Sequence, residues 1–139
     1  MFETILVPTD LSENGEKAVE VAVGLAGGRN PVVHVLHVIE PIADTPFEDL
    51  EDFYSRLEEQ ARRRLDELTS PYQREGLVIR NHLVYGPRAQ EILRFAEENE
   101  VDLIALKSHR IELKPPLQGW GTLSYKVGIL AQCPVMLVK

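Results

Sequence analysis

The 139-residue sequence has one cysteine, no long apolar run and no excess of positive charge. Cys133 alone cannot form an intrachain disulfide and matches no metal or redox spacing, which indicates a reducing compartment. No apolar stretch approaches the roughly 20 residues that a bilayer span requires. The first residues, Met1-Phe2-Glu3, lack the basic and apolar regions of a signal peptide. We therefore expect a cytoplasmic protein with no membrane partner.

Basic residues are outnumbered, with 15 Lys and Arg against 22 Asp and Glu, which leaves a formal charge of −7. This balance repels phosphate backbones at long range, so no nucleic-acid partner is expected. With 44% hydrophobic and 27% charged residues, a chain of this length can bury roughly 70% of its unfolded surface. We predict one domain over residues 1–139.

Familiar phosphate and metal motifs are also missing. There is no G-x-G-x-x-G after the first β-rich run and no G-x-x-x-x-G-K-[ST] anywhere, which excludes ordinary Rossmann and P-loop chemistry. His34 and His37 lie three apart on a predicted strand, so they should point to opposite faces and cannot chelate one metal. His82 is expected on the surface of a strand. We predict no metal site.

Short β-rich runs alternate with longer amphipathic stretches. The predicted strands are residues 4–7, 32–39, 77–84, 101–106 and 135–138. The first helix is predicted to start at Ser12 as N-cap and to end at Gly27, and the second to cover residues 50–68. A third helix follows Pro87, and the last should run from about Gly121 to Ala131. This alternation predicts an α/β fold: an open, parallel five-stranded sheet with helices on both faces.

Ligands of such sheets bind beyond the carboxyl ends of the strands, where the strand order reverses. A helix N-terminus with glycine and a hydroxyl residue could add donors for a phosphate. These rules select Pro8, Thr9 and Asp10 after the first strand, Val38 in the second, Lys107, Ser108, His109 and Arg110 after the fourth, and Gly121 and Thr122 at the last helix. Asp10 could instead cap or orient the first helix, and His109 could be an ordinary loop residue.

Five segments, in order and spacing, resemble the universal stress protein family along essentially the whole chain. They are ILVPTDLSE at 5–13, LHVIE at 36–40, GPRAQEI at 86–92, VDLI at 101–104 and CPVMLV at 133–138. The resemblance implies a Rossmann-like sheet of order 3-2-1-4-5, similar to the adenine nucleotide alpha hydrolases, and a homodimer. In one branch of the family it also implies an ATP site between the first and fourth strands.

In that branch the phosphate segment looks like G-x-x-G, about nine residues, then G-[ST]. The resemblance places Asp10 and the Val38 backbone at adenine, Pro8 and Thr9 beside the nucleoside, Ser108 and His109 along the phosphate turn, and Gly121 and Thr122 at the far phosphates. Here Lys107 and Arg110 replace the two glycines. A left-handed backbone would cost each of them roughly 1–2 kcal/mol, whereas their charges could attract a triphosphate. ATP is thus a candidate cofactor and none is certain.

The sequence therefore favours a non-catalytic, dimeric stress-response or regulatory module with a lost or altered nucleotide site and an unidentified protein partner. The alternative is an ATP- or AMP-binding sensor with a rebuilt phosphate turn. A weak nucleotide hydrolase comes third, since Asp10, Ser108 and His109 supply only loose catalytic candidates. The dimer edge is predicted at the last strand, whose apolar residues Val135, Met136, Leu137 and Val138 invite pairing with a second copy.

Overall fold

The computed structural model describes residues 2–108 and 122–139. The strands are β1 Thr4–Pro8, β2 Val32–Ile39, β3 Val78–Tyr85, β4 Leu103–Lys107 and β5 Val135–Val138. The helices are α1 Glu16–Leu25, α2 Glu51–Thr69, α3 Arg88–Glu98 and α4 Thr122–Leu130, and the short 3₁₀ turns η1 Phe47–Leu50 and η2 Ser70–Tyr72 flank α2. All strand pairs are parallel and the order is β3-β2-β1-β4-β5, as predicted. In the described ranges, no helix combines the length and the apolar character needed to cross a membrane.

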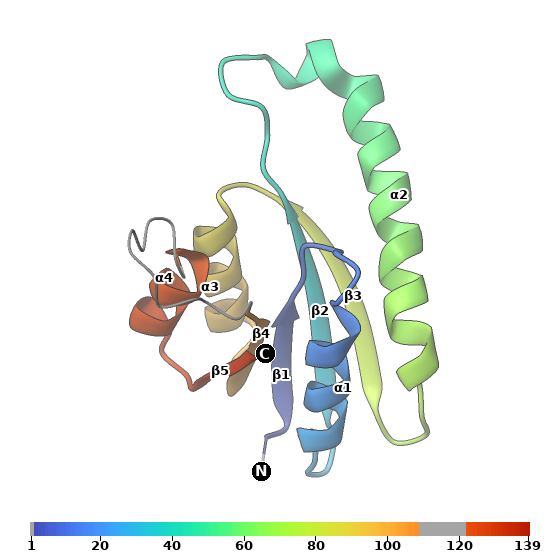
Figure 1. Ribbon diagram of the computed structural model, residues 1–139, viewed down its shortest axis with the longest axis vertical. Coiled ribbons are helices and arrows are strands. Elements are labelled where there is room, and N and C mark those ends of the chain that lie inside the picture. The colour runs from blue at the N-terminus through green and yellow to red at the C-terminus, as the bar shows by residue number, and fades with distance from the viewer. Residues whose placement is uncertain (1, 109–121) are drawn as a thin grey trace.

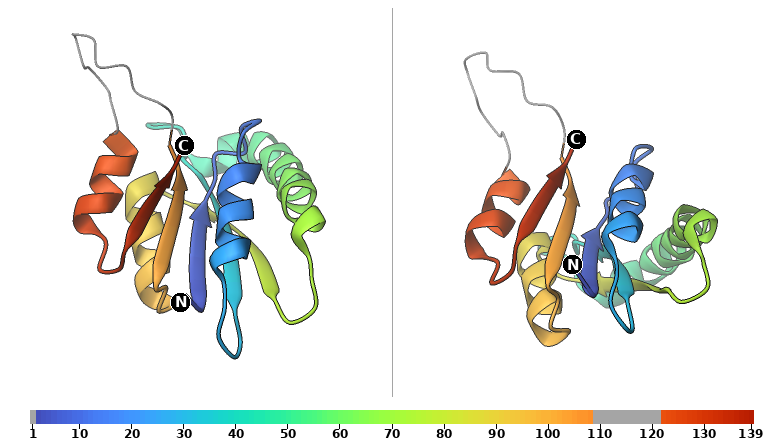
Figure 2. Two further views of the ribbon diagram at one scale, coloured as in Figure 1. Left: turned by 60° about the horizontal axis from the view of Figure 1, so that its bottom comes forward. Right: turned by 90° about the horizontal axis from the view of Figure 1, so that it is seen from below.

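Helices cover both faces of the sheet: α1 and α2 lie on one side, α3 and α4 on the other (Figures 1 and 2). Alternate strand residues supply the two cores because successive side chains point to opposite faces. The α1/α2 core contains Ile5, Val7, Val33, Val35, Val19 and Leu65. The α3/α4 core contains Leu6, Leu36, Val38, Ile92, Ile104 and Val127. Burial on both faces explains why β2 reads as a nearly continuous apolar run.

The prediction that Ser12 caps α1 is wrong, because α1 begins only after Gly15. The Asp10 carboxylate accepts the Ser12 backbone N–H at 2.9 Å, and the Thr9 hydroxyl accepts the Leu11 N–H at 3.0 Å. Leu11 adopts a left-handed φ of 62°. Such side-chain bonds compete with helical hydrogen bonds, so the chain makes a turn before it enters the helix.

Strand β4 is tied to β1 by Asp102. Its carboxylate accepts the backbone N–H groups of Glu3 and Thr4 at 3.0 and 3.2 Å. The strand starts two residues later than predicted and continues through Lys107. The reason is that the Val101 N–H still bonds to the Ala96 carbonyl at the end of α3.

The prediction that His82 lies on the surface of a strand is wrong. Its side chain is half-buried and pairs with another histidine. His34 Nδ1 and His82 Nε2 lie 2.9 Å apart, and Phe95 of α3 contacts both rings. The parallel register, which sets Leu36 beside His82, brings the two imidazoles onto the α3 face. His37 has other neighbours, because its Nδ1–H donates to the Thr9 carbonyl at 2.9 Å. The two histidines of β2 thus have separate partners, in keeping with the predicted opposite faces.

Candidate functional site

A small cleft lies where the strand order reverses, above the carboxyl ends of β1 and β2 and beside that of β4. Its lining residues are Pro8, Thr9, Asp10, Ser12, Gly15, Leu36, Val38, Arg88, Ile92, Leu106, Lys107 and Leu123. Its cavity volume is about 70 Å³, well below the roughly 300 Å³ of typical ligand pockets. A ligand of nucleotide size would therefore extend from the cleft toward solvent.

Five of the ten residues selected from the sequence meet in this cleft: Pro8, Thr9, Asp10, Val38 and Lys107. Ser108 is buried beside the end of β5, where its N–H donates to the Val138 carbonyl at 2.8 Å and its hydroxyl accepts from Lys139 Nζ at 3.2 Å. Thr122 is the first residue of α4. His109, Arg110 and Gly121 lie outside the described residues.

The floor of the cleft is apolar and was only partly predicted. Leu36 and Val38, two apart on β2, share a face with Ile92 of α3 and Leu106 of β4. Strand alternation could have found Leu36, since it must point the same way as Val38. An apolar floor with a few polar groups at its rim suits a flat, partly polar molecule such as a nucleobase.

Thr9 and Asp10 form the polar rim and are held by several bonds. The Thr9 N–H donates to the Leu36 carbonyl at 2.9 Å, while the Thr9 carbonyl accepts from His37. Burial acts to raise the pKa of Asp10, but hydrogen bonds from Ser12 and the charge of Arg88 outweigh it and leave the pKa below its usual value. Asp10 is thus ionised at neutral pH. It both orients the turn before α1 and lines the cleft.

Lys107 carries no backbone strain, contrary to the expectation from its glycine-like position. In the described ranges the non-glycine residues with positive φ are Leu11, Asp44 and Glu100, whereas Lys107 is the last residue of β4. The roughly 1–2 kcal/mol cost of a left-handed residue therefore does not arise at this position. What the lysine changes is the side chain, whose Nζ lies 3.5 Å from the Ser108 carbonyl oxygen.

Arg88 was missed by the sequence reasoning, although it is the first residue of α3 and lines the cleft. Its Nε lies 3.6 Å from Glu40 Oε1, and both side chains are about half exposed. The rule used to select site residues considers the carboxyl ends of strands, and β3 ends at Tyr85. Arg88 lies three residues beyond that end, where the start of α3 places it at the cleft.

The described part of the cleft has binding groups but no catalytic arrangement. Its ionisable side chains are Asp10, Arg88 and Lys107, and in residues 2–108 and 122–139 no three His, Cys, Asp or Glu side chains gather as a metal site. Among the described lining residues, the hydroxyl groups that Asp10 could activate are those of Thr9 and Ser12, which belong to the same turn. The arrangement can hold a polar planar group and an anion.

Comparison with known proteins agrees with this architecture. The model of the universal stress protein family matches residues 1–139. A universal stress protein from Thermus aquaticus is 32% identical over 144 residues, with 100% of both chains covered. The solved structure of MJ0577 from Methanocaldococcus jannaschii is 26% identical with a TM-score of 0.81, covering 100% of this chain and 96% of that one.

A universal stress protein from Archaeoglobus fulgidus, solved in complex with dAMP, has the same fold. It is 23% identical with a TM-score of 0.70, and 98% of this chain and 97% of that chain are covered. The family model matches the full length of the chain, and the strand order and the cleft agree with that match. The chain belongs to the universal stress protein family.

Proposed function

We propose that this chain is a non-catalytic, dimeric stress-response module whose switch-point cleft is an altered site for an adenine nucleotide. The observation that carries the proposal is that Pro8, Thr9, Asp10, Val38 and Lys107 line one cleft with an apolar floor. Family relatives with the same fold include a protein solved with dAMP. The site is altered rather than conventional because two cations stand where the ATP-binding branch has glycines.

Titration with ATP, ADP and AMP, with and without Mg²⁺, tests the nucleotide site by calorimetry. Binding is expected, and Asp10→Ala should weaken it. Lys107→Gly should weaken it as well, because the backbone at residue 107 is already extended and glycine would remove only the cation. Glu97→Ala, on the exposed C-terminal turn of α3, is the control for a general change of charge. Absence of any heat at millimolar nucleotide would leave the lost-site alternative.

The non-catalytic part of the proposal rests on the bonding of Asp10. Hydrolysis needs a base next to a positioned nucleophile or metal-bound water, and this carboxylate is taken up by the Ser12 N–H. Incubation with Mg²⁺-ATP should release no more phosphate than buffer alone. Phosphate release that disappears in Asp10→Ala would refute this part.

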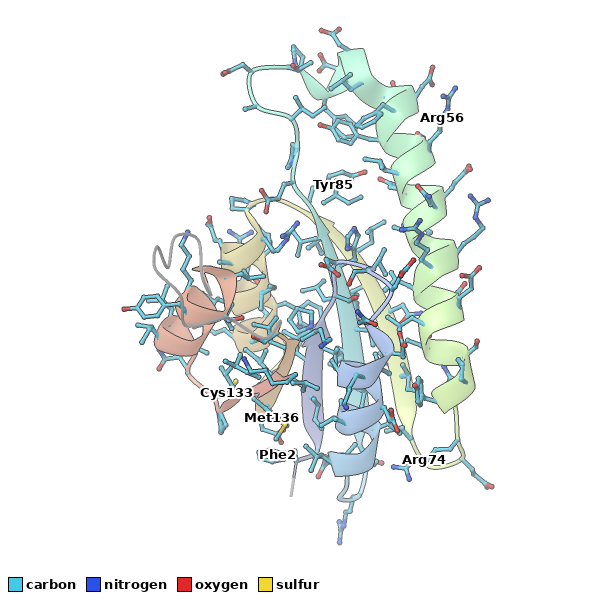
Figure 3. The ribbon with its side chains drawn as sticks, in the orientation of Figure 1. Phe2, Arg56, Arg74, Tyr85, Cys133 and Met136 are labelled. Carbon is cyan, nitrogen blue, oxygen red and sulfur yellow. The ribbon has the colours of Figure 1, made fainter. Side chains whose placement is uncertain are left out.

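Dimerisation is proposed through β5, an edge of the sheet (Figure 1). Met136 of β5, which is labelled in Figure 3, packs against the α1/α2 core. The next residue of the strand, Leu137, is 43% exposed. The neighbouring α4 exposes Tyr125 and Ile129, each at 65%. An open strand edge next to exposed apolar side chains favours pairing with a second copy.

The ladder determines which variant tests the dimer. The Pro134 carbonyl accepts the N–H of Ile104 in β4, and the Val138 carbonyl accepts the N–H of Ser108 just after β4. Because alternate residues of a strand point their backbone groups to opposite sides, the N–H of Leu137 must point away from β4, toward the open edge. Leu137→Pro removes that donor without removing a bond to β4. Light scattering should show a dimer for the wild type and a monomer for Leu137→Pro. A variant that stays dimeric would refute this interface.

A further inference from the structure

Arg88 lines the cleft, although it does not belong to the segment expected to bind phosphate, which is residues 107–110 with Gly121 and Thr122. It begins α3, faces the cleft beside Asp10 and Lys107, and also borders an adjoining hollow with Glu40 and Lys126. Among the described residues that line the two hollows, three side chains are cationic and two are carboxylates, although the whole chain carries a charge of −7. The cations are Arg88, Lys107 and Lys126, and the carboxylates are Asp10 and Glu40. This local positive balance favours an anionic group on the ligand.

The ion pair of Arg88 is weak enough to exchange. A single contact of 3.6 Å joins Nε to Glu40 Oε1, and the exposed fractions of the two side chains are 44% and 54%. Exposed pairs of this kind contribute little to stability, because water and salt screen the two charges. A phosphate can instead accept two parallel N–H bonds from one guanidinium, which is among the strongest charge-assisted contacts.

The position of Arg88 at the N-terminus of an 11-residue helix adds to this preference. The backbone dipole of α3 favours negative charge in front of its first turn. Glu40 opposes the same charge, because a phosphate near Arg88 would also approach its carboxylate. Arg88 and Glu40 therefore act in opposite directions on an anionic ligand.

We propose that Arg88 is the specificity-determining residue of the cleft, which recognises a phosphate of the bound adenine nucleotide, with Glu40 as its resting counter-ion. This rests on the proposed nucleotide site and adds to it the residue that selects a nucleotide over its nucleoside. The phosphate is then held by Arg88 and Lys107 rather than by backbone donors of a glycine turn. Most of the difference in affinity between the nucleotide and its nucleoside then comes from the contact with Arg88.

Calorimetric titration with adenosine and with AMP tests the proposal in five proteins: wild type, Arg88→Ala, Arg88→Lys, Glu40→Gln and Arg94→Ala. The wild type should bind AMP about 10–100-fold more tightly than adenosine, as expected for a charge-assisted hydrogen bond of about 1.5–3 kcal/mol. Arg88→Ala should remove most of this preference and change adenosine affinity less than about two-fold. Arg88→Lys should keep part of it, because lysine retains the charge but not the paired donors.

The two remaining variants separate a direct contact from a general effect of charge. Glu40→Gln should strengthen AMP binding several-fold, since the competing carboxylate is gone. Arg94→Ala is the matched control, because Arg94 lies on the same helix but pairs with Glu91 at 3.0 Å, and it should change neither affinity. An AMP preference that survives Arg88→Ala refutes the role of Arg88 and leaves the nucleotide site standing. A wild type that binds neither adenosine nor AMP refutes both proposals.

Discussion

The His34–His82 pair should make the stability of the fold depend on pH between about 4 and 6.5. His34 is 8% exposed, and its Nδ1 meets His82 Nε2 at 2.9 Å. Burial lowers the pKa of His34 to about 4 from 6.5, and the charges of His82 and Arg80 act in the same direction. Burial and Arg80 also lower the pKa of His82. A single proton lies between His34 Nδ1 and His82 Nε2, so one ring donates and the other accepts. If both of these nitrogens carried a proton, two N–H groups would face each other and the hydrogen bond would be lost.

The sign follows from linkage. The pKa of His34 is depressed in the folded state, so between pH 6.5 and 4 the unfolded chain binds more protons. The stability contribution is complete above pH 6.5 and is lost as the pH falls toward 4. With a folded-state pKa of about 4 against 6.5 in the unfolded chain, the loss of stability between pH 8 and pH 5 is about 2 kcal/mol. Water that reaches the half-buried His82 hydrates part of the charge, so we expect about 1–2 kcal/mol.

Urea denaturation at pH 8, 6.5 and 5 measures this loss in the wild type and in His34→Gln. The wild type should lose about 1–2 kcal/mol more than the variant between pH 8 and pH 5. Val33→Ala is the control, because it lowers stability by opening a cavity in the other core and should keep the wild-type pH slope. Equal slopes in wild type and His34→Gln would refute the reasoning. An NMR titration of His34 should give a midpoint near pH 4.

Three further predictions concern the backbone that carries the site. Gly86→Ala should lower the unfolding free energy by about 1–3 kcal/mol, because φ is +144° and a Cβ would lie 2.8 Å from the Glu91 side chain; an unchanged urea midpoint would contradict it. Gly24→Ala should stabilise by about 0.5 kcal/mol in the same assay, since α1 leaves open space there. Asp102→Ala should cost about 1–3 kcal/mol through the lost bonds to Glu3 and Thr4, and Asp102→Asn should recover part of this; a fully neutral Asp102→Ala would mean that β1 and β4 need no such tie.

Element order could be predicted because it depends on local periodicity. The continuous apolar run of β2 and the helical spacing in α2 and α3 are visible in the sequence and hold in the structure. The start of α1 could not be predicted in the same way. Ser12 has the right chemistry for an N-cap, but Thr9 and Asp10 bind the next backbone N–H groups first. The start of α1 therefore depends on the turn that leaves β1.

Contacts between segments that are distant in the sequence could not be predicted. His34 and His82 are 48 residues apart, and a one-residue shift of β3 against β2 would turn His82 to the opposite face. Periodicity gives the face of each strand but not the register between strands. Arg88 was missed for a related reason, because its place at the cleft depends on how α3 packs over the sheet and not on any pattern around residue 88.

Lys107 stands where the resemblance implies a glycine, but the backbone there does not need one. A glycine is needed where the backbone is left-handed or where a side chain would block a ligand. At residue 107 the backbone is the end of a strand, so only the second reason applies, and the lysine side chain lines the cleft together with Arg88. At the first glycine position that the resemblance implies, lysine exchanges a backbone approach to phosphate for a cation. In the proposed nucleotide site, the apolar floor of Leu36, Val38 and Leu106 would hold the base. The charges of Arg88 and Glu40, which oppose each other at the rim, would then decide whether a phosphate is accepted.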